Sequence, residues 1–441
     1  MMLFLFAVLF HLFLYWPLEF FSYPEFHIYP YLVNRGLIPY RQIIDQHFPA
    51  LTLTGTNFYS LGFTDPLDFK KLALLLILVQ SVFIFKSAGK LRLKGRYFSV
   101  FAFALWQIYF AGNHLWYDSF VGFFAVIAFY YWLGRKYFVS GLLLGAAVLF
   151  KQSALILPLF LIPWAAVCSP GRLKTAFRFA AGVFLPVAAL FYWVYSRGVF
   201  DEFWFWTIEF NWLYYPTLAF SPPSFRAVLY LISPALVVVS SLIYQNKRTS
   251  VLFPVVWAGL LVLSGFTRVD RMHFQAAVPF LSLITGVLAA DLYRYKRIVF
   301  YALSAFLIAV FGRYYFRQSH FFQYRFFDSA SLRLAQSISR RVPAGDKTFL
   351  LGVQPHLYVL SGTLPSGSFF VYQLPWYLHL TGDRMLADLA LDPPRYIFFD
   401  TSAVVDKVPV TEYARPLLQF IRRDYRLMDK IGDVEVYESR Y

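Results

Sequence analysis

Long apolar runs separated by short polar connections fill the first 312 residues of the chain. A helical run of about 20 apolar residues crosses a bilayer core of roughly 30 Å, and somewhat shorter runs cross with help from neighbouring helices. Eleven runs suit this role. They are residues 2–18, 70–86, 97–112, 119–133, 138–150, 153–168, 178–196, 227–244, 249–265, 275–292 and 298–312. The pattern predicts an all-α polytopic membrane protein with about 11 transmembrane helices.

The composition supports a membrane protein and excludes several other classes. Apolar residues make up 59% of the chain and charged residues 15%, whereas soluble domains carry about 25% charge. This composition excludes a disordered or collagen-like chain. Cys168 is the only cysteine, so the chain cannot form an intrachain disulfide and is not a disulfide scaffold.

Basic residues are concentrated in alternate connections between the apolar runs. The connections near 86–96, 135–136, 172–178, 247–248 and 294–297 are basic and contain no acid. The positive-inside rule places them in the cytoplasm, so the net charge of +16 indicates membrane topology rather than nucleic-acid binding. We expect a multi-pass protein of the cell (inner) membrane, with a cytoplasmic N-terminus and an extracytoplasmic C-terminus.

The chain changes character near Arg313, so we predict a transmembrane domain at 1–312 and a small extracytoplasmic α/β domain at 313–441. Helical periodicity marks Ser331–Arg341 and Arg415–Tyr425. Three short runs rich in β-formers are predicted strands, namely Thr348–Val353, Arg395–Asp400 and Val434–Glu438.

Ionisable residues avoid the predicted spans and gather in the outer loops. A transporter would place functional polar groups within its spans, so this distribution favours chemistry at the outer membrane surface. The first outer loop, 19–69, is the longest before the C-terminal domain. Within it, Phe26, Tyr29, Val33 and Leu37 follow helical spacing, which predicts an amphipathic helix on the membrane surface that stops near Gly36.

Four motifs occur along the first 310 residues of the chain, and their order is informative. The first outer loop has an acid at Glu25, then Gly-Leu-Ile-Pro-Tyr-Arg and His-Phe-Pro. Later come Asn113–Asp118, a glycine-containing span at Ser140–Gln152 that includes Lys151, and Arg268–Phe274 before Pro279. In order and topology, residues 1–310 resemble the GT-C glycosyltransferases. They are similar to the protein mannosyltransferase-like, aminoarabinose transferase-like and rhizobial lipopolysaccharide core transferase-like branches.

The resemblance implies an inverting transferase that moves a hexosyl or pentosyl unit from a polyprenyl-phosphate donor to an acceptor lipid, glycan or protein outside the cytoplasm. It implies catalytic roles for Glu25, as general base, and for Asp118. The implied donor-phosphate residues are His47, Lys151, Arg268, Arg271 and His273. Membrane lipids are expected partners; nucleic acid is not.

The chemistry is consistent with these roles. An attacking acceptor hydroxyl loses a proton, which a carboxylate accepts, and cations stabilise charge on the departing phosphate. This scheme requires no cofactor, and nothing in the sequence indicates a divalent metal. The chain departs from the family in having one acid where relatives often have two, at Glu25, and in having His47 where some relatives have lysine.

Each site residue also has a structural interpretation. Ser22 and Glu25 match a capping box, and Asp118 suits a helix N-terminus. The candidate phosphate ligands would also suit lipid headgroups. The aromatic segment 203–215 fits an interfacial helix, or a surface that stacks on sugar or holds a prenyl chain. At the level of function, the alternatives are a transporter or flippase of lipid-linked saccharide and a non-catalytic envelope-assembly subunit.

Overall fold

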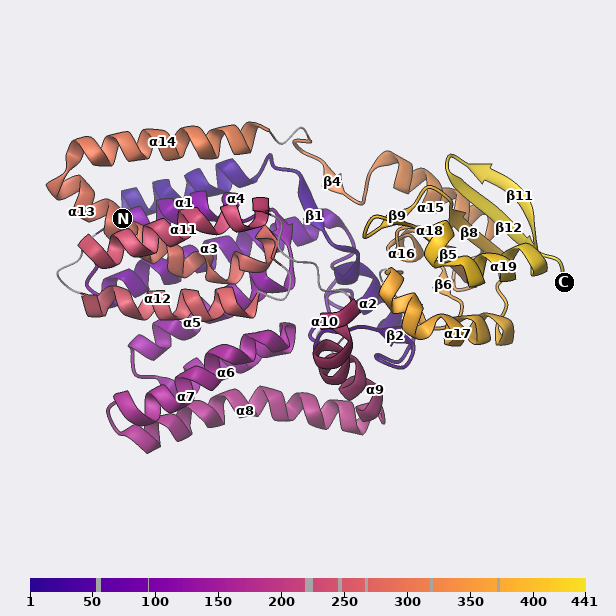
Figure 1. Cartoon of the computed structure of the whole chain (residues 1–441), viewed down its shortest axis with the longest axis horizontal. Helices are drawn as coiled ribbons and strands as arrows, with labels where there is room; N and C mark the ends of the chain where they lie inside the picture. The colour runs from indigo at the N-terminus through magenta and orange to yellow at the C-terminus, as the bar shows by residue number, and fades with distance from the viewer. Residues whose placement is uncertain are drawn as a thin grey trace. The chain divides into compact units, whose positions relative to one another are not determined.

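The computed structural model describes residues 1–52, 57–93, 95–218, 225–244, 248–265, 269–317, 320–370 and 373–441. The chain packs as two compact units (Figure 1). Unit 1 contains Met1–Ser22, Leu67–Trp193 and Phe220–Gln323, and unit 2 contains Tyr23–Pro66, Val194–Ala219 and Tyr324–Tyr441. Packing therefore divides the chain differently from the predicted boundary at 312/313, because two segments that precede the boundary belong with the C-terminal part.

Unit 1 is built from helices, and every predicted apolar run lies on one of them (Figure 1). They are α1 Met2–Tyr15, α3 Pro66–Lys90, α4 Arg96–Tyr109, α5 Tyr117–Leu133, α6 Tyr137–Phe150, η1 Gln152–Leu155, α7 Ile156–Cys168, α8 Arg172–Ser196, α11 Phe225–Tyr244, α12 Arg248–Ser264, η3 Arg271–Ala277, α13 Val278–Tyr295 and α14 Arg297–Phe316. Two short strands, β1 Phe20–Ser22 and β3 His114–Leu115, pair in parallel.

Four helical segments within the described residues are long and apolar enough to cross a membrane. They are Pro66–Lys90, Arg172–Ser196, Arg271–Tyr295 and Arg297–Phe316. The shorter apolar helices include Tyr117–Leu133 and Tyr137–Phe150. The chain is thus a mostly helical protein with several apolar helices, and the number of spans stays a prediction.

Small residues allow helices of unit 1 to approach closely. A Cβ atom on Gly141 of α6 would collide with the carbonyl oxygen of Phe179 on α8, and one on Gly182 of α8 would collide with that of Phe138. Small residues at helix interfaces are typical of membrane helix packing because they bring backbones together. This contact fixes α6 against α8 and so fixes Lys151 at the end of α6.

Unit 2 combines a mixed sheet with helices from three parts of the chain (Figure 1). Its early elements are α2 Pro24–Asn34, β2 Ile43–Ile44, α9 Phe200–Trp204, the π-helix η2 Phe205–Tyr214 and α10 Tyr215–Leu218. Its later elements are β4 Tyr324–Arg325, α15 Ser329–Arg341, β5 Lys347–Leu351, α16 Leu357–Ser361, β6 Leu364–Pro365, β7 Phe369–Phe370, α17 Pro375–Leu391, β8 Tyr396–Asp400, β9 Val404–Val405, β10 Val408–Pro409, α18 Val410–Tyr413, α19 Arg415–Asp424, β11 Tyr425–Ile431 and β12 Val434–Ser439.

The main sheet has the strand order β11-β12-β8-β5-β6. Strands β6, β5 and β8 are parallel, while β12 runs antiparallel to β8 and β11. The three predicted strands form β5, β8 and β12, and the two predicted helices form α15 and α19. The central strands are apolar because both of their faces are covered; Phe349, Leu350, Ile397 and Phe398 are all buried.

Helix α2 of the first outer loop is buried within unit 2. The predicted helix is present and ends just before Gly36, which has a φ of +90°. The expected one-sided placement on a membrane surface is wrong, because every residue from Pro24 to Leu32 is buried. The C-terminal part of the chain provides some of this cover, since Tyr31 Oη donates a hydrogen bond to Thr363 O and β2 pairs in parallel with β7.

Candidate functional site

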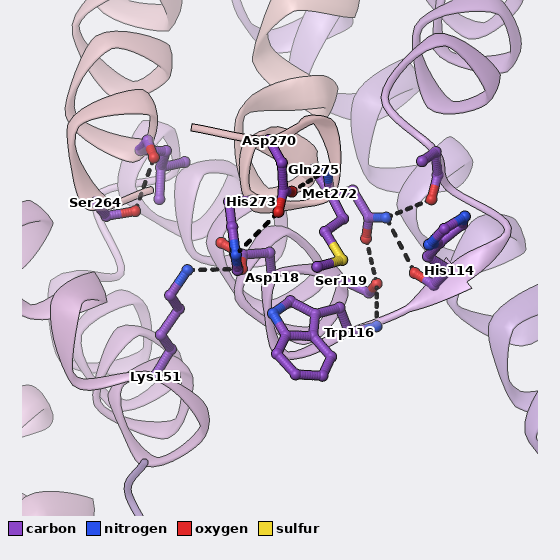
Figure 2. Close-up of polar contacts among 12 residues, drawn as sticks. His114, Trp116, Asp118, Ser119, Lys151, Ser264, Asp270, Met272, His273 and Gln275 are labelled. Atoms are coloured by element: carbon purple, nitrogen blue, oxygen red, sulfur yellow. Dashed lines mark hydrogen bonds and ion pairs between the residues drawn. The ribbon is translucent and has the colours of Figure 1, made fainter. Parts of the chain in front are cut away.

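Unit 1 contains an ionic cluster in which Asp118, Lys151 and His273 are buried and Asp270 is partly exposed (Figure 2). Lys151 Nζ donates to Asp118 Oδ2 over 2.7 Å, and His273 Nδ1 lies 3.3 Å from the same oxygen. On its other side, His273 Nε2 lies 3.6 Å from Asp270 Oδ2. The structure therefore brings together three predicted site residues that are far apart in sequence, namely Asp118, Lys151 and His273.

Each member of the cluster stands at the end of a helical element. Asp118 is in the first turn of α5, Lys151 is the C-cap of α6, and Asp270 is the N-cap of η3, where its side chain accepts from Met272 N. A carboxylate at a helix N-terminus and an ammonium at a helix C-terminus both match the helix dipole. The dipole interpretation of Asp118 is thus compatible with its ionic contacts.

Gln275 holds η3 against the loop before α5, a role that no sequence motif predicted. Its Nε2 donates to Ala111 O over 2.6 Å and to His114 O over 3.0 Å, and its Oε1 accepts from Ser119 Oγ (Figure 2). Ser119 Oγ in turn accepts from Trp116 N. This network fixes the distance between α5 and η3, and with it the distance between Asp118 and His273.

One oxygen of the cluster is unsatisfied. Asp118 is fully buried, yet within the described part of the chain its Oδ1 has no hydrogen-bond partner. Leaving a buried charged oxygen unpaired is costly, so such an atom usually faces a ligand or ordered water. Lys151 also has donor hydrogens beyond the one that it gives to Asp118. The cluster can therefore offer both an acceptor and a donor to a bound molecule.

Arg271 has a different environment, between aromatic rings. Its guanidinium carbon lies 4.7 Å from the ring centroid of Tyr230 and 4.4 Å from that of Tyr314. Stacking of this kind fixes the plane of the guanidinium group. Its Nη1 is buried without a hydrogen-bond partner among the described residues. An oriented guanidinium group with one nitrogen unpaired can bind an anion with well-defined geometry.

A second group of predicted residues lies in unit 2. Glu25, in the first turn of α2, is 2% exposed, and His47 Nδ1 pairs with Asp45 Oδ1 over 2.9 Å. Burial and then the negative charges of Asp45 and Glu25 raise the pKa of Tyr377 well above its ordinary value. Glu25 and Asp45 therefore both lie close enough to Tyr377 to act on it electrostatically. Asp45 and Tyr377 were not predicted as site residues.

The structure also bears on the alternative interpretation of Glu25. The N-cap of α2 is Tyr23, which makes no side-chain capping bond, so the helix begins one residue later than the Ser22–Glu25 spacing predicted. Arg268 lies outside the described residues. Within the described residues, no group of three His, Cys, Asp or Glu side chains is arranged to hold a metal ion.

Comparison with known proteins establishes the fold. No protein-family model matches the chain, and no curated protein matches it in sequence. ArnT from Cupriavidus metallidurans, solved with bound undecaprenyl phosphate, is similar in structure with a TM-score of 0.62 and 12% identity, over 99% of this chain and 97% of ArnT.

Two further solved structures are similar. The mycobacterial arabinofuranosyltransferase AftD gives a TM-score of 0.57 at 14% identity, over 99% of this chain but only 41% of AftD. The Archaeoglobus fulgidus oligosaccharyltransferase, tethered to an acceptor peptide, gives a TM-score of 0.56 at 11% identity, over 100% of this chain and 74% of the oligosaccharyltransferase chain. All three are GT-C glycosyltransferases, so the chain has the GT-C fold, as the sequence motifs indicated.

The ionic cluster generates a prediction about stability. Asp118→Ala leaves two partners in a buried site without their shared counter-charge, so we expect a loss of about 3–5 kcal/mol in the free energy of unfolding. The matched control is Asp68→Ala, because Asp68 pairs with Lys71 at an exposed site of unit 1, over 3.3 Å. That change should cost at most about 1 kcal/mol. Unfolding in detergent measures both, and equal losses would contradict the importance of the buried cluster.

Proposed function

We propose that this GT-C-fold chain is an integral membrane glycosyltransferase that transfers a sugar from a polyprenyl-phosphate donor to an acceptor on the extracytoplasmic face. The observation that carries the proposal is the buried cluster of Asp118, Lys151 and His273, with an unsatisfied carboxylate oxygen and unused donors. ArnT, which has the same fold, was solved with undecaprenyl phosphate, and this supports a lipid-linked donor.

In this proposal, cationic residues of unit 1 bind the donor phosphate. Lys151 and Arg271 supply N–H donors, and charge-assisted bonds of this kind stabilise the negative charge that grows on a departing phosphate. Asp118 holds Lys151 and His273 in position. Its open Oδ1 would accept a hydrogen bond from a hydroxyl group of the substrate. His47 and His273 are weaker candidates, because His47 already pairs with Asp45 and the two ring nitrogens of His273 face Asp118 and Asp270.

We assign the general base to Glu25, in unit 2. Its burial and its position in the first turn of α2 hold the carboxylate in place. A fixed carboxylate is suited to taking the proton from an attacking hydroxyl group. In a single displacement, the acceptor oxygen bonds to the anomeric carbon as the bond to the lipid phosphate breaks, so the reaction would invert the anomeric centre.

The location of the ionic groups in unit 1 favours an enzyme over a flippase. A transporter of lipid-linked saccharide would require polar groups along the middle of its spans. Here, the clustered charges occur at the start of α5, at the end of α6 and on η3. We further propose about eleven spans in the inner membrane, a cytoplasmic N-terminus and an extracytoplasmic C-terminal region, from the charge distribution of the loops.

Replacing Glu25 separates a catalytic from a structural role. Glu25→Gln preserves size and hydrogen bonding but cannot accept the proton. We expect a folded protein with near-normal donor binding and transfer at least about 100-fold slower. Glu412→Gln is a matched control, because Glu412 is an exposed acid in the first turn of α18. If Glu25→Gln transfers sugar within a few-fold of the wild-type rate, Glu25 is not the base, and Asp118 becomes the candidate for that role.

The donor-site assignment is tested at Arg271. Arg271→Ala removes the stacked guanidinium group, so undecaprenyl phosphate should bind about 10-fold more weakly or worse, equivalent to roughly 1.4 kcal/mol or more. Arg294→Ala is the control, because Arg294 also stacks on a tyrosine, Tyr295, but is exposed in the last turn of α13. Equal donor affinities for the wild type and a folded Arg271→Ala protein would show that Arg271 is not a phosphate ligand.

A further inference from the structure

Three adjoining hollows lie along one part of unit 2, between the α9–η2 segment, the first outer loop and α17. Their volumes are about 420, 470 and 290 Å³. The first two share Asp201 and Phe205, and the last two share Arg384, so the hollows adjoin one another, and we refer to the three together as the groove. Pockets that bury a drug-sized ligand have volumes of roughly 300–1,000 Å³. Each hollow is thus comparable in volume with a small-ligand pocket, and three adjoining hollows suit a chain of several linked units better than one small molecule.

The walls of the groove combine aromatic rings with hydrogen-bonding groups. Phe205 and Tyr214 both line the middle hollow, are half-buried, and have ring centroids 5.8 Å apart. Asp201, Arg384 and Thr381 line the same hollow. A sugar ring has a C–H face that packs on aromatic rings and hydroxyl groups that both donate and accept hydrogen bonds. This mixture of walls matches a saccharide better than it matches a purely apolar ligand.

The charges along the groove disfavour an anionic ligand. Acidic side chains outnumber basic ones around the three hollows: the acids are Asp201, Glu202, Glu209, Asp388 and Asp392, and the bases are Arg41, Lys347 and Arg384. An anionic lipid headgroup or a phosphate would be repelled by this excess of negative charge. A neutral, hydroxyl-rich ligand would not be repelled, and it could donate to the carboxylates.

The groove is held in shape by contacts within unit 2. Arg41 Nε pairs with Glu202 over 2.6 Å, and Arg41 Nη2 donates to Gly198 O. Burial opposes the charged form of Glu202, but the hydrogen bond and charge of Arg41 outweigh it and lower the pKa of this carboxyl. Arg384 donates to Arg41 O over 2.7 Å. A groove that is ordered before binding loses less entropy when it takes up a ligand.

The π-helix η2 presents Phe205 to this groove. Asn211 stabilises the π-helix, because its Nδ2 donates to Thr207 O and to Gln46 O of the first outer loop, each over 3.0 Å. On the inner side, Phe210 packs on Trp376 and Tyr377 of α17, with centroids 5.4 and 5.6 Å away. Segments of π-helix are uncommon and are frequent at functional sites. Here the segment ties together the three parts of the chain that line the groove.

We propose that this groove binds a neutral oligosaccharide as the acceptor chain. That the saccharide is an acceptor rests on the proposed transferase function, whereas saccharide binding itself depends only on the groove. The three hollows in series predict that affinity rises with the number of sugar units.

Binding to immobilised neutral oligosaccharides tests the proposal without the donor. The probes are gluco-, manno-, galacto- and arabino-oligosaccharides, from monosaccharides to hexasaccharides, presented to the full chain in detergent. We expect at least one series to bind, with longer chains binding more tightly. Phe205→Leu and Arg384→Gln should each weaken binding about 10-fold. Undecaprenyl phosphate affinity should be unchanged in both variants.

Two control variants distinguish the groove from general surface effects. Trp212→Leu alters an aromatic residue of η2 that is 79% exposed, and Arg333→Gln alters an exposed arginine of α15. Both should bind saccharide as the wild type does. If no series binds, or if the groove variants bind as the controls do, the groove is not a saccharide site. If saccharides bind through the groove but the wild type does not bind undecaprenyl phosphate, the transferase proposal fails and the groove remains a saccharide site.

Discussion

The pairing of the Asp118 carboxylate with Lys151 and His273 is the interaction on which the ionic cluster of unit 1 depends. The carboxylate is fully buried, so its charge is tolerated only because Lys151 and His273 meet it at one oxygen. These ion pairs link α5, α6 and η3. The glycine contacts of α6 and the hydrogen bonds of Gln275 hold these elements in position. The same pairing leaves the other oxygen of Asp118 and part of Lys151 available to a substrate.

Much of this fold could be predicted from the sequence, because hydrophobicity specifies where membrane-type helices run. Each apolar segment coincides with a helix, and β5, β8 and β12 were recognisable as short runs of β-forming residues. Other elements have weaker signals. Strand β11 is at the sheet edge, mostly exposed and rich in charge, so its sequence does not alternate in the usual way. Helix α17 contains Gly382, which lowers its apparent helical propensity.

The tertiary surroundings of the first outer loop could not be predicted in the same way. A spacing of apolar residues shows that α2 has an apolar face, but not what covers the opposite face. That cover includes residues more than 300 positions later, as the bond from Tyr31 to Thr363 shows. Motifs pointed to Asp118, Lys151 and His273, and the structure brings these three residues together. The roles of Gln275 and Asp45 depend on contacts that no local pattern encodes.

The central claim is that unit 1 binds the phosphate of a polyprenyl donor at its buried cations. A cryo-EM map of the full chain in lipid nanodiscs with undecaprenyl phosphate tests it most directly. The account predicts phosphate density within hydrogen-bonding distance of Lys151 and Arg271, with Asp118 still holding Lys151. Phosphate density away from both residues, with their surroundings unchanged from the ligand-free protein, would contradict it.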